Sequence, residues 1–306
     1  MLKSQSAMEY LMTYGWAILL IGIAIAVLFE LGVFNISPPS ASPGSCSVVR
    51  PLGPETVTGI SLAGECGGLL PQYVTTFSSS EGSVTAVNTL VIDPSTERVT
   101  ITGWIYPTSM TSPVLITFAA AESGVSGSLV SDFYLDVNDN GNNEADANYN
   151  YYTKIGLGDC STSSPTNSLS LNKWYFVAGT LSASGCTVYV NGGTGLSSGY
   201  FWTGGAQSPV AEPAAYIGAY NVSVAPSNSF QGDIANVQMY NTTLSQNEIT
   251  TLYYRGIGSA PIDLNHLQGW WPLNGNLNDY SGNGFNSTTS TNTLFTSNWK
   301  NGYTIP

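Results

Sequence analysis

The sequence predicts a mainly β protein in which a long hydrophobic helix at the N-terminus precedes a β-sandwich. Residues 6–34 form an apolar run that only Glu9 and Glu30 interrupt with charge. Beyond residue 45, short apolar or β-branched stretches alternate with clusters of Gly, Asn, Ser and Pro, a pattern typical of strands joined by turns. Aromatic residues make up 11% of the chain, which provides enough apolar surface for a packed core.

The N-terminal run is long enough to cross a membrane. Its uncharged part, from Tyr10 to Phe29, has about the 20 residues that a transmembrane helix needs. A secretory signal peptide fits poorly, because its apolar core usually spans about 7–15 residues and no Ala-x-Ala cleavage site follows this run. A simple membrane anchor is one interpretation. It does not explain Glu9, since a charge at a membrane span is costly and is usually functional.

The segment from Lys3 to Glu9 resembles the class III signal of archaeal type IV pilins. In that family a short basic leader is removed after a small residue, and a glutamate follows close to the new N-terminus. The resemblance implies cleavage by a prepilin peptidase between Ser4 and Gln5. Residues 1–4 would then be a leader, and residues 5–34 a helix that is held in the cytoplasmic membrane before it assembles into a filament.

A physical role for Glu9 follows from this cleavage. The new α-amino group of Gln5 would lie about one helical turn from Glu9. A carboxylate in apolar surroundings needs a partner, and in a helical bundle Glu9 of one subunit would meet the Gln5 amine of its neighbour. We therefore expect Gln5 and Glu9 to set the register between subunits.

Charge places the rest of the chain outside the cell. Lys3 is the only basic residue before the helix, so the positive-inside tendency puts the residues after the helix on the outer side. Only 8% of the residues are charged and the net charge is −12, which argues against nucleic acid as a partner. An exposed extracellular β protein suits this composition.

Cysteines and sequons agree with an extracellular location. Four cysteines follow the helix, and an oxidising setting favours disulfides between them. Sequence order favours the pairs Cys46–Cys66 and Cys160–Cys186. Metal binding is the alternative, although the chain has no Cys-x-x-Cys and a single histidine, His266. Asn-x-Ser/Thr sequons predict N-glycosylation, and they occur at Asn35, Asn221, Asn241 and Asn286.

A linker and several strands follow the helix. Residues 35–44 are rich in Pro and Ser and are predicted to be a linker that holds an outer domain away from the helix. Strands are predicted where polar and apolar residues alternate, as in residues 99–106, 174–181 and 187–190.

One short helix is predicted from Ser245 to Gly256. Ser245 and Glu248 form a capping box, and Gly256 stands where a helix C-cap belongs. Many strands with a single short helix favour a β-sandwich.

Several segments together resemble laminin-G-like, concanavalin A-like jelly rolls. Residues 230–241 and 244–249 carry the resemblance, and residues 103–107, 174–178 and 188–192 fit the same family in the same order. The likeness covers about residues 77–255 and implies a jelly-roll sandwich. Related jelly rolls often bind calcium in loops at the rim of the sandwich.

A further segment of this family stands out of order. Residues 269–284 resemble the segment that normally opens such domains, although they lie near the C-terminus. We therefore expect a circularly permuted sandwich, in which residues 45–306 form one ectodomain and residues 268–285 complete it as a strand.

The densest group of oxygen ligands lies in residues 136–146. Asp136, Asn138 and Asn140 match the first half of a calcium loop, and Glu144 or Asp146 would replace the glutamate that such loops carry later. The alternative is a solvated turn rich in Asn and Asp.

Aromatic residues beside this loop, and those of a second aromatic cluster, are candidates for a glycan site. Aromatic faces stack on sugars, although core packing also explains such residues. The candidates are Tyr149, Tyr151, Tyr200 and Trp202.

Catalytic motifs are incomplete, so we predict no enzyme. Residues 144–148 are similar to the Glu-x-Asp-x-Glu strand of retaining glycosidases on this fold, but Asn148 replaces the second carboxylate that retaining hydrolysis needs. Residues 195–199 match Gly-x-Ser-x-Gly, but they precede no helical pattern, and only His266 could act as a base.

Together these features predict a structural subunit of an archaeal type IV pilus-like extracellular filament. Copies of the helix would form the filament core, and the sandwich would be displayed outside, where it would adhere to surface glycans. A monomeric membrane-anchored lectin or adhesin is the alternative. A third interpretation, an anchored glycan hydrolase, lacks its catalytic pair.

Overall fold

The computed structural model describes the chain in separate stretches. These are residues 18–23, 47–49, 61–63, 70–78, 83–87, 98–110, 116–125, 128–137, 144–152, 157–165, 168–199, 201–203, 214–218, 230–287 and 289–306. The chain divides into two compact units, residues 1–41 and residues 42–306.

In the first unit, the described residues 18–23 are helical and exposed. They belong to the predicted helix 5–34. The remainder of that helix, the leader 1–4, Gln5, Glu9 and the linker 35–44 lie outside the described residues. Within the stretches that are described, no helix has both the length and the hydropathy needed to cross a membrane.

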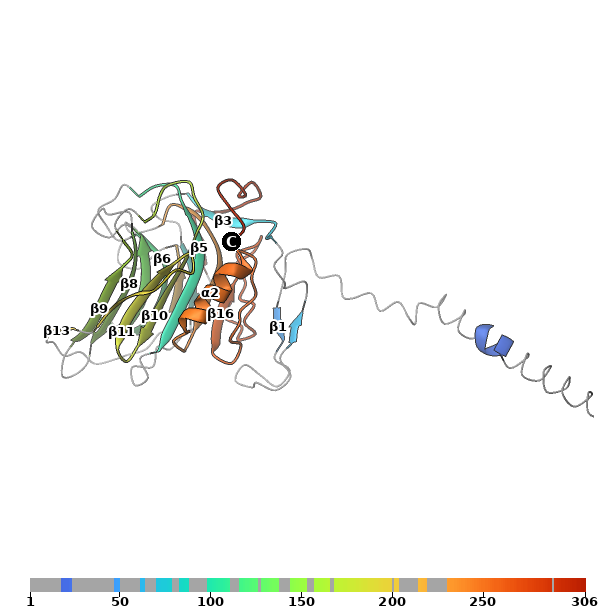
Figure 1. Cartoon of the computed structure of the whole chain (residues 1–306), viewed down its shortest axis with the longest axis horizontal. Coiled ribbons are helices and arrows are strands. Elements are labelled where there is room, and N and C mark those ends of the chain that lie inside the picture. Colours follow the sequence, from blue (N-terminus) through green and yellow to red (C-terminus); the bar gives the residue numbers. More distant parts are fainter. Residues whose placement is uncertain are drawn as a thin grey trace, which may run out of the picture. The chain divides into compact units, whose positions relative to one another are not determined.

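The second unit is a sandwich of two antiparallel sheets (Figure 1). In its described part, sheet I has eight strands, with β16 (Leu267–Trp271) beside β15 and the others in the order β12 (Leu196–Ser198), β11 (Gly185–Val190), β10 (Tyr175–Ser182), β5 (Val99–Pro107), β15 (Gly232–Tyr240), β3 (Val74–Phe77) and β18 (Thr293–Thr296). Sheet II has eight strands in the order β13 (Phe201–Thr203), β9 (Leu157–Ser163), β8 (Ala145–Tyr152), β7 (Ser128–Val137), β6 (Ile116–Val125), β14 (Ala214–Ile217), β4 (Ser83–Val87) and β17 (Thr289–Thr291). A separate ladder joins β1 (Ser47–Val49) and β2 (Ser61–Ala63). The predicted β-sandwich is therefore confirmed.

The main core lies between the two sheets. Alternate residues of β5, such as Val99, Ile101 and Ile105, are fully buried there against Phe133 and Leu135 of β7. Gly179 of β10 leaves room for the Leu135 side chain, because a Cβ at position 179 would lie 2.2 Å from a Leu135 methyl carbon. Side chains of the two sheets thus interdigitate closely.

A second core covers the outer face of sheet I. Ile249 and Leu252 of α2 (Gln246–Arg255) pack there against Trp104 and Phe176. This cover explains why β5 is buried on both faces. The predicted capping box of α2 is present, because the Ser245 hydroxyl accepts from a backbone N–H of the first turn while the Ser245 N–H donates to Glu248.

The C-terminal segment contributes to both cores. β16 pairs with β15 in the same chain, from Val237 opposite Trp271 to Tyr240 opposite Leu267. Its two tryptophans point in opposite directions, Trp271 into the core between the sheets and Trp270 into the outer core. The strand that we expected within residues 268–285 is thus present, and it begins at Leu267.

A disulfide joins the two sheets. Cys160 of β9 is bonded to Cys186 of β11, with their Cα atoms 5.9 Å apart. This is one of the two pairings that sequence order favoured. The other candidates, Cys46 and Cys66, lie outside the described residues.

Candidate functional site

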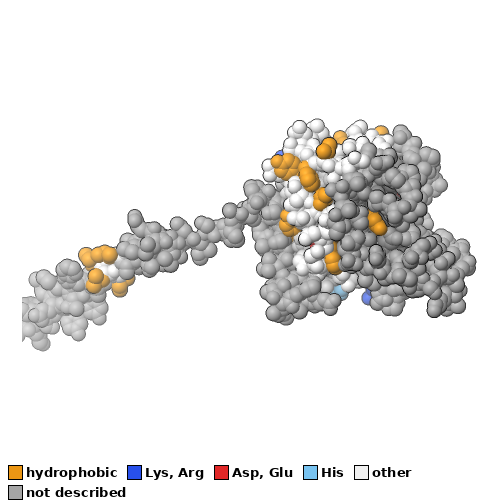
Figure 2. Space-filling model, turned by 180° about the vertical axis from the view of Figure 1, so that it is seen from behind, with side chains coloured by type: hydrophobic (Ala, Val, Ile, Leu, Met, Phe, Trp, Pro, Cys, Tyr) orange, Lys and Arg blue, Asp and Glu red, His pale blue; other side chains and the backbone are white. Residues whose placement is uncertain are grey.

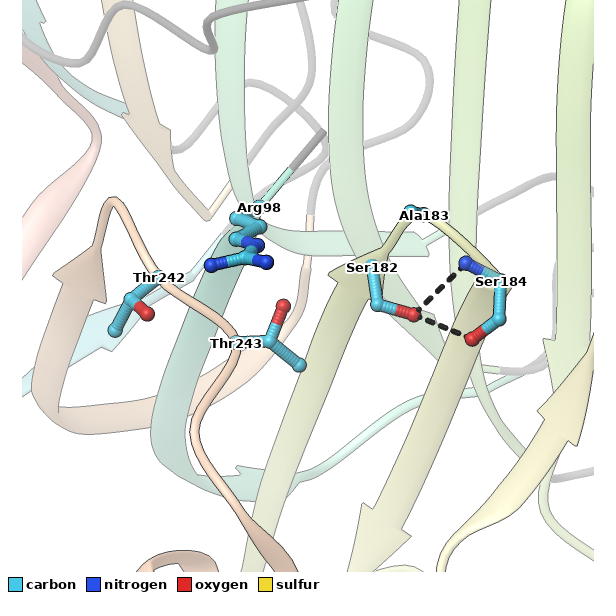
Figure 3. Close-up of a pocket in the computed structure, with 6 residues that line it drawn as sticks. All are labelled: Arg98, Ser182, Ala183, Ser184, Thr242 and Thr243. Atoms are coloured by element: carbon cyan, nitrogen blue, oxygen red, sulfur yellow. Dashed lines mark hydrogen bonds between the residues drawn. The ribbon is translucent and has the colours of Figure 1, made fainter. Parts of the chain in front are cut away.

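A pocket of about 510 Å³ opens at one end of sheet I (Figure 3). The start of β5, the turn between β10 and β11, and the segment after β15 meet there. Antiparallel pairing brings them together, because Leu181 lies opposite Val99 and Tyr240 lies opposite Thr100. The lining residues are Arg98, Ser182, Ala183, Ser184, Thr242 and Thr243.

The turn between β10 and β11 forms one wall. The hydroxyls of Ser182 and Ser184 are 2.8 Å apart, and the Ser184 N–H also donates to the Ser182 hydroxyl at 3.2 Å. Gly185 follows with φ 125°, and a Cβ there would lie 2.0 Å from the Ser198 carbonyl oxygen. Only glycine fits this position, so the turn places both serines at the pocket.

The segment between β15 and α2 forms the opposite wall. The Thr100 hydroxyl donates to the Thr242 carbonyl at 2.7 Å and accepts from the Leu244 N–H at 2.9 Å. The Thr243 hydroxyl donates to the Leu181 carbonyl. These bonds tie the segment to β5 and β10, so that Thr242 and Thr243 are held at the pocket.

Arg98 supplies the charge of the pocket. In Figure 3 its guanidinium lies between the threonine wall and the serine turn. Arg98 is exposed and has no hydrogen bond or ion pair to any residue that the structure describes. The described lining residues include no carboxylate and no histidine. The pocket therefore offers one permanent cation and four hydroxyls, which are groups that bind polar ligands.

The predicted calcium residues lie toward the other end of the sandwich. Asp136 of β7 stands opposite Asp146 of β8, Glu144 precedes β8, and all three side chains are buried and have interaction partners. Asn138 and Asn140 lie outside the described residues. Among the residues that are described, no three acidic, histidine or cysteine side chains form a group that could hold a metal ion. Calcium binding stays a prediction.

The predicted aromatic site is described only through its backbone. Tyr149 lies opposite Cys160, while Tyr151 and Trp202 both lie opposite Gly158, from β8 and β13 respectively. Tyr200 lies outside the described residues. The proposal that these aromatic residues stack on sugars stays a prediction.

The Gly-x-Ser-x-Gly match does not form a turn before a helix. Residues 196–198 form β12 at the edge of sheet I, and the Ser197 hydroxyl accepts from Thr187 at 3.1 Å. His266 Nδ1 lies 2.7 Å from an Asp263 carboxylate oxygen, just before β16. This geometry differs from the strand–turn–helix of a nucleophile elbow.

Two of the four predicted glycosylation sites are described, and both are exposed. Asn241 directly precedes the pocket residue Thr242. The Oδ1 atom of Asn286 accepts a hydrogen bond from the Asp279 N–H at 3.0 Å. Asn35 and Asn221 lie outside the described residues. A glycan on Asn241 would stand at the edge of the pocket.

Sequence reasoning missed this pocket. Its three segments are far apart in the chain, and only the register of sheet I brings them together. The one available signal was Arg98, a basic residue directly before a predicted strand in a chain with only seven lysines and arginines.

Comparison with known proteins identifies a family. Residues 78–250, more than half of the chain, match the family model described as the concanavalin A-like lectin/glucanases superfamily. No curated protein matches the chain.

Several solved structures are similar to the chain at low sequence identity. The heptameric SAP-like pentraxin of Limulus polyphemus is 11% identical, with 84% of this chain and 96% of that chain covered and a TM-score of 0.41. A putative carbohydrate binding protein of Bacteroides ovatus is 18% identical, with coverages of 78% and 64% and a TM-score of 0.47. The CBM40 of the Ruminococcus gnavus IT-sialidase, bound to α2,3-sialyllactose, is 15% identical, with coverages of 61% and 99% and a TM-score of 0.42.

Proposed function

Because the chain belongs to the concanavalin A-like lectin/glucanases superfamily, we propose that its ectodomain, residues 45–306, binds glycans at the cell surface. The observation that carries this proposal is the pocket at Arg98. It presents the hydroxyls of Ser182, Ser184, Thr242 and Thr243 around one guanidinium. Sugars are recognised by such hydrogen-bonding groups held on a rigid scaffold.

The proposed activity is binding without hydrolysis. Retaining and inverting glycosidases both use a pair of carboxyl groups beside the scissile bond, and the described residues that line the pocket contribute none. Glu144 and Asp146, the remaining carboxylates of the glycosidase-like strand, are buried.

The N-terminal segment supports a filament role for the whole chain. We propose that a prepilin peptidase removes residues 1–4 and that residues 5–34 leave the membrane to pack with copies of themselves in a type IV pilus-like filament. The spacing of Gln5 and Glu9 supports this proposal. A monomeric membrane-anchored lectin, with the leader retained, is the alternative.

Two experiments test these proposals separately. Glycan binding is tested with the full-length chain in detergent on an array of neutral and acidic oligosaccharides, and binding to none of them would refute it. Assembly is tested by imaging surface filaments and sequencing their N-terminal peptides. We expect Gln5 at the N-terminus. We also expect Glu9→Ala to insert into the membrane without assembling, while Glu30→Ala assembles normally; filaments of Glu9→Ala chains would contradict the proposed pairing.

A further inference from the structure

Arg98 is an unusual charge on this molecule. The net charge is −12, and few of the described side chains that are coloured in Figure 2 are charged. Lys173, Arg255 and Lys300 are the other lysines and arginines in the described part of the chain. Arg98 lines the pocket at the end of sheet I. In the part of the chain that the structure describes, no carboxylate neutralises it, since the one ion pair there joins His266 and Asp263.

The guanidinium sets the chemistry of a ligand. It is planar, permanently charged and carries five N–H donors in a fork that fits a carboxylate through two parallel hydrogen bonds. A single guanidinium in a pocket matches a single acidic group. Nucleic acid does not match this pocket, because its many phosphates need a cluster of basic residues.

The hydroxyls determine what else the ligand carries. The Thr242 hydroxyl makes no hydrogen bond with any described residue. The Thr243 hydroxyl donates its hydrogen bond to the Leu181 carbonyl, so its lone pairs can still accept hydrogen bonds from a ligand. Ser184 lies across the pocket, bonded to Ser182. These groups can donate to and accept from several hydroxyls of a ligand at once.

We propose that the Arg98 pocket binds a carboxylate-bearing sugar of an acidic glycan. The guanidinium holds the carboxylate, and Thr242, Thr243 and Ser184 bond to the ring hydroxyls. The volume of about 510 Å³ is in the range of small-ligand pockets. This inference rests on the proposed glycan-binding function and names the class of sugar that the site takes.

The test compares the binding of each acidic sugar with that of its uncharged methyl ester. Trigalacturonate and trimannuronate carry a carboxylate on every ring, and their methyl esters keep the rings while losing the charge. Binding of all four is measured by calorimetry with the full-length chain in detergent, produced in a host without N-glycosylation so that Asn241 carries no glycan. We expect at least one acid to bind about tenfold more tightly than its ester, because a charge-assisted pair is lost in the ester.

Variants assign the effect to Arg98. We expect Arg98→Gln to lower the affinity for the acid about tenfold and to leave the weak binding of the ester unchanged. Arg98→Lys should restore only part of the affinity, because an ammonium lacks the fork. Lys300→Gln removes the same charge at an exposed position away from the pocket and should bind like the parent. Thermal melting of each variant shows that the fold is intact.

The outcomes separate this inference from the proposed function. Equal affinity for acid and ester, unaffected by Arg98→Gln, would overturn the inference while glycan binding stands. Binding of a sulfated trisaccharide but of neither uronate would also overturn it, because the acidic group would then be a sulfate. Failure to bind these ligands and every neutral glycan on the array would refute the proposed function itself.

Discussion

The indole Nε1 of Trp270 donates a hydrogen bond to Oδ1 of Asn236 at 2.8 Å, and this contact joins β16 to a bulge in β15. Asn236 has φ 51° and is buried, and its Nδ2 donates to the Ser259 carbonyl at 2.8 Å. Gln238 Nε2 donates to the same Asn236 oxygen at 3.1 Å. One amide side chain thus satisfies polar groups from three segments.

We expect Asn236→Ala to lower the free energy of unfolding by about 2–4 kcal/mol. The indole N–H would lose its buried partner, which costs about 1–3 kcal/mol, and alanine at a left-handed φ adds about 1 kcal/mol. Chemical denaturation measures the change. Asn236→Gly is the matched control, since it removes the amide but accepts the backbone angle, and it should be less damaging than alanine. Equal stability of Asn236→Ala and the parent would contradict the role of this network.

Truncation after Ile257 should unfold or aggregate the ectodomain. It removes Trp270, Trp271 and Leu273, which are buried, and each contributes about 1.5–3 kcal/mol to a total stability of about 5–15 kcal/mol. It also opens an edge of β15 to other chains. Size-exclusion chromatography measures the outcome. Removal of residues 304–306 alone is the control and should be tolerated. A soluble, equally stable chain ending at Ile257 would refute the importance of β16.

Loss of the Cys160–Cys186 bond should cost about 3 kcal/mol. The two residues are 26 positions apart, and a disulfide closing a loop of this order stabilises mainly by restricting the unfolded chain. The double variant Cys160→Ala/Cys186→Ala should therefore unfold at lower denaturant. Reductant should shift the unfolding midpoint of the parent and leave that of the double variant less affected. The idea fails if reductant shifts both proteins equally.

Calcium should raise the melting temperature of the full-length chain if residues 136–146 hold the ion. A ligand that binds only the native state stabilises it in proportion to the logarithm of its concentration, so the shift should grow between micromolar and millimolar calcium. Asp146→Asn should reduce this shift, because Asp136 and Asp146 face each other across β7 and β8. Magnesium at equal concentration is the control for ionic strength. The same melting temperature in chelator and in millimolar calcium would favour an ordinary turn.

The sequence predicted the elements that local patterns specify. Alternation located strands at residues 99–106 and 174–181, close to β5 (Val99–Pro107) and β10 (Tyr175–Ser182). The capping box located α2 almost to the residue, because caps are local hydrogen bonds between neighbours in the chain. The tryptophans of residues 269–284 indicated a buried strand, since exposing them together is costly.

The features that could not be predicted depend on pairing between strands that are far apart in the chain. The pocket exists because Val99, Leu181 and Tyr240 become neighbours in sheet I, and no local pattern encodes that register. The bulge at Asn236 could not be predicted either, because an asparagine with a left-handed backbone conformation inside a strand has no sequence signature of its own. Arg98 looked like an ordinary surface residue until its neighbours were known.

One edge of β15 pairs with two different segments, and this arrangement has a consequence for how the protein folds during synthesis. Residues near position 75 pair with one half of this strand and residues near position 270 with the other half. Trp299 Nε1 also donates to the Pro71 carbonyl across 228 positions of the chain. During synthesis from the N-terminus, β15 therefore emerges before β16 and Trp299 exist to cover it. Sheet I can therefore be completed only after residues 267–299 have been made, and until then one edge of β15 is open to pairing with a neighbouring chain.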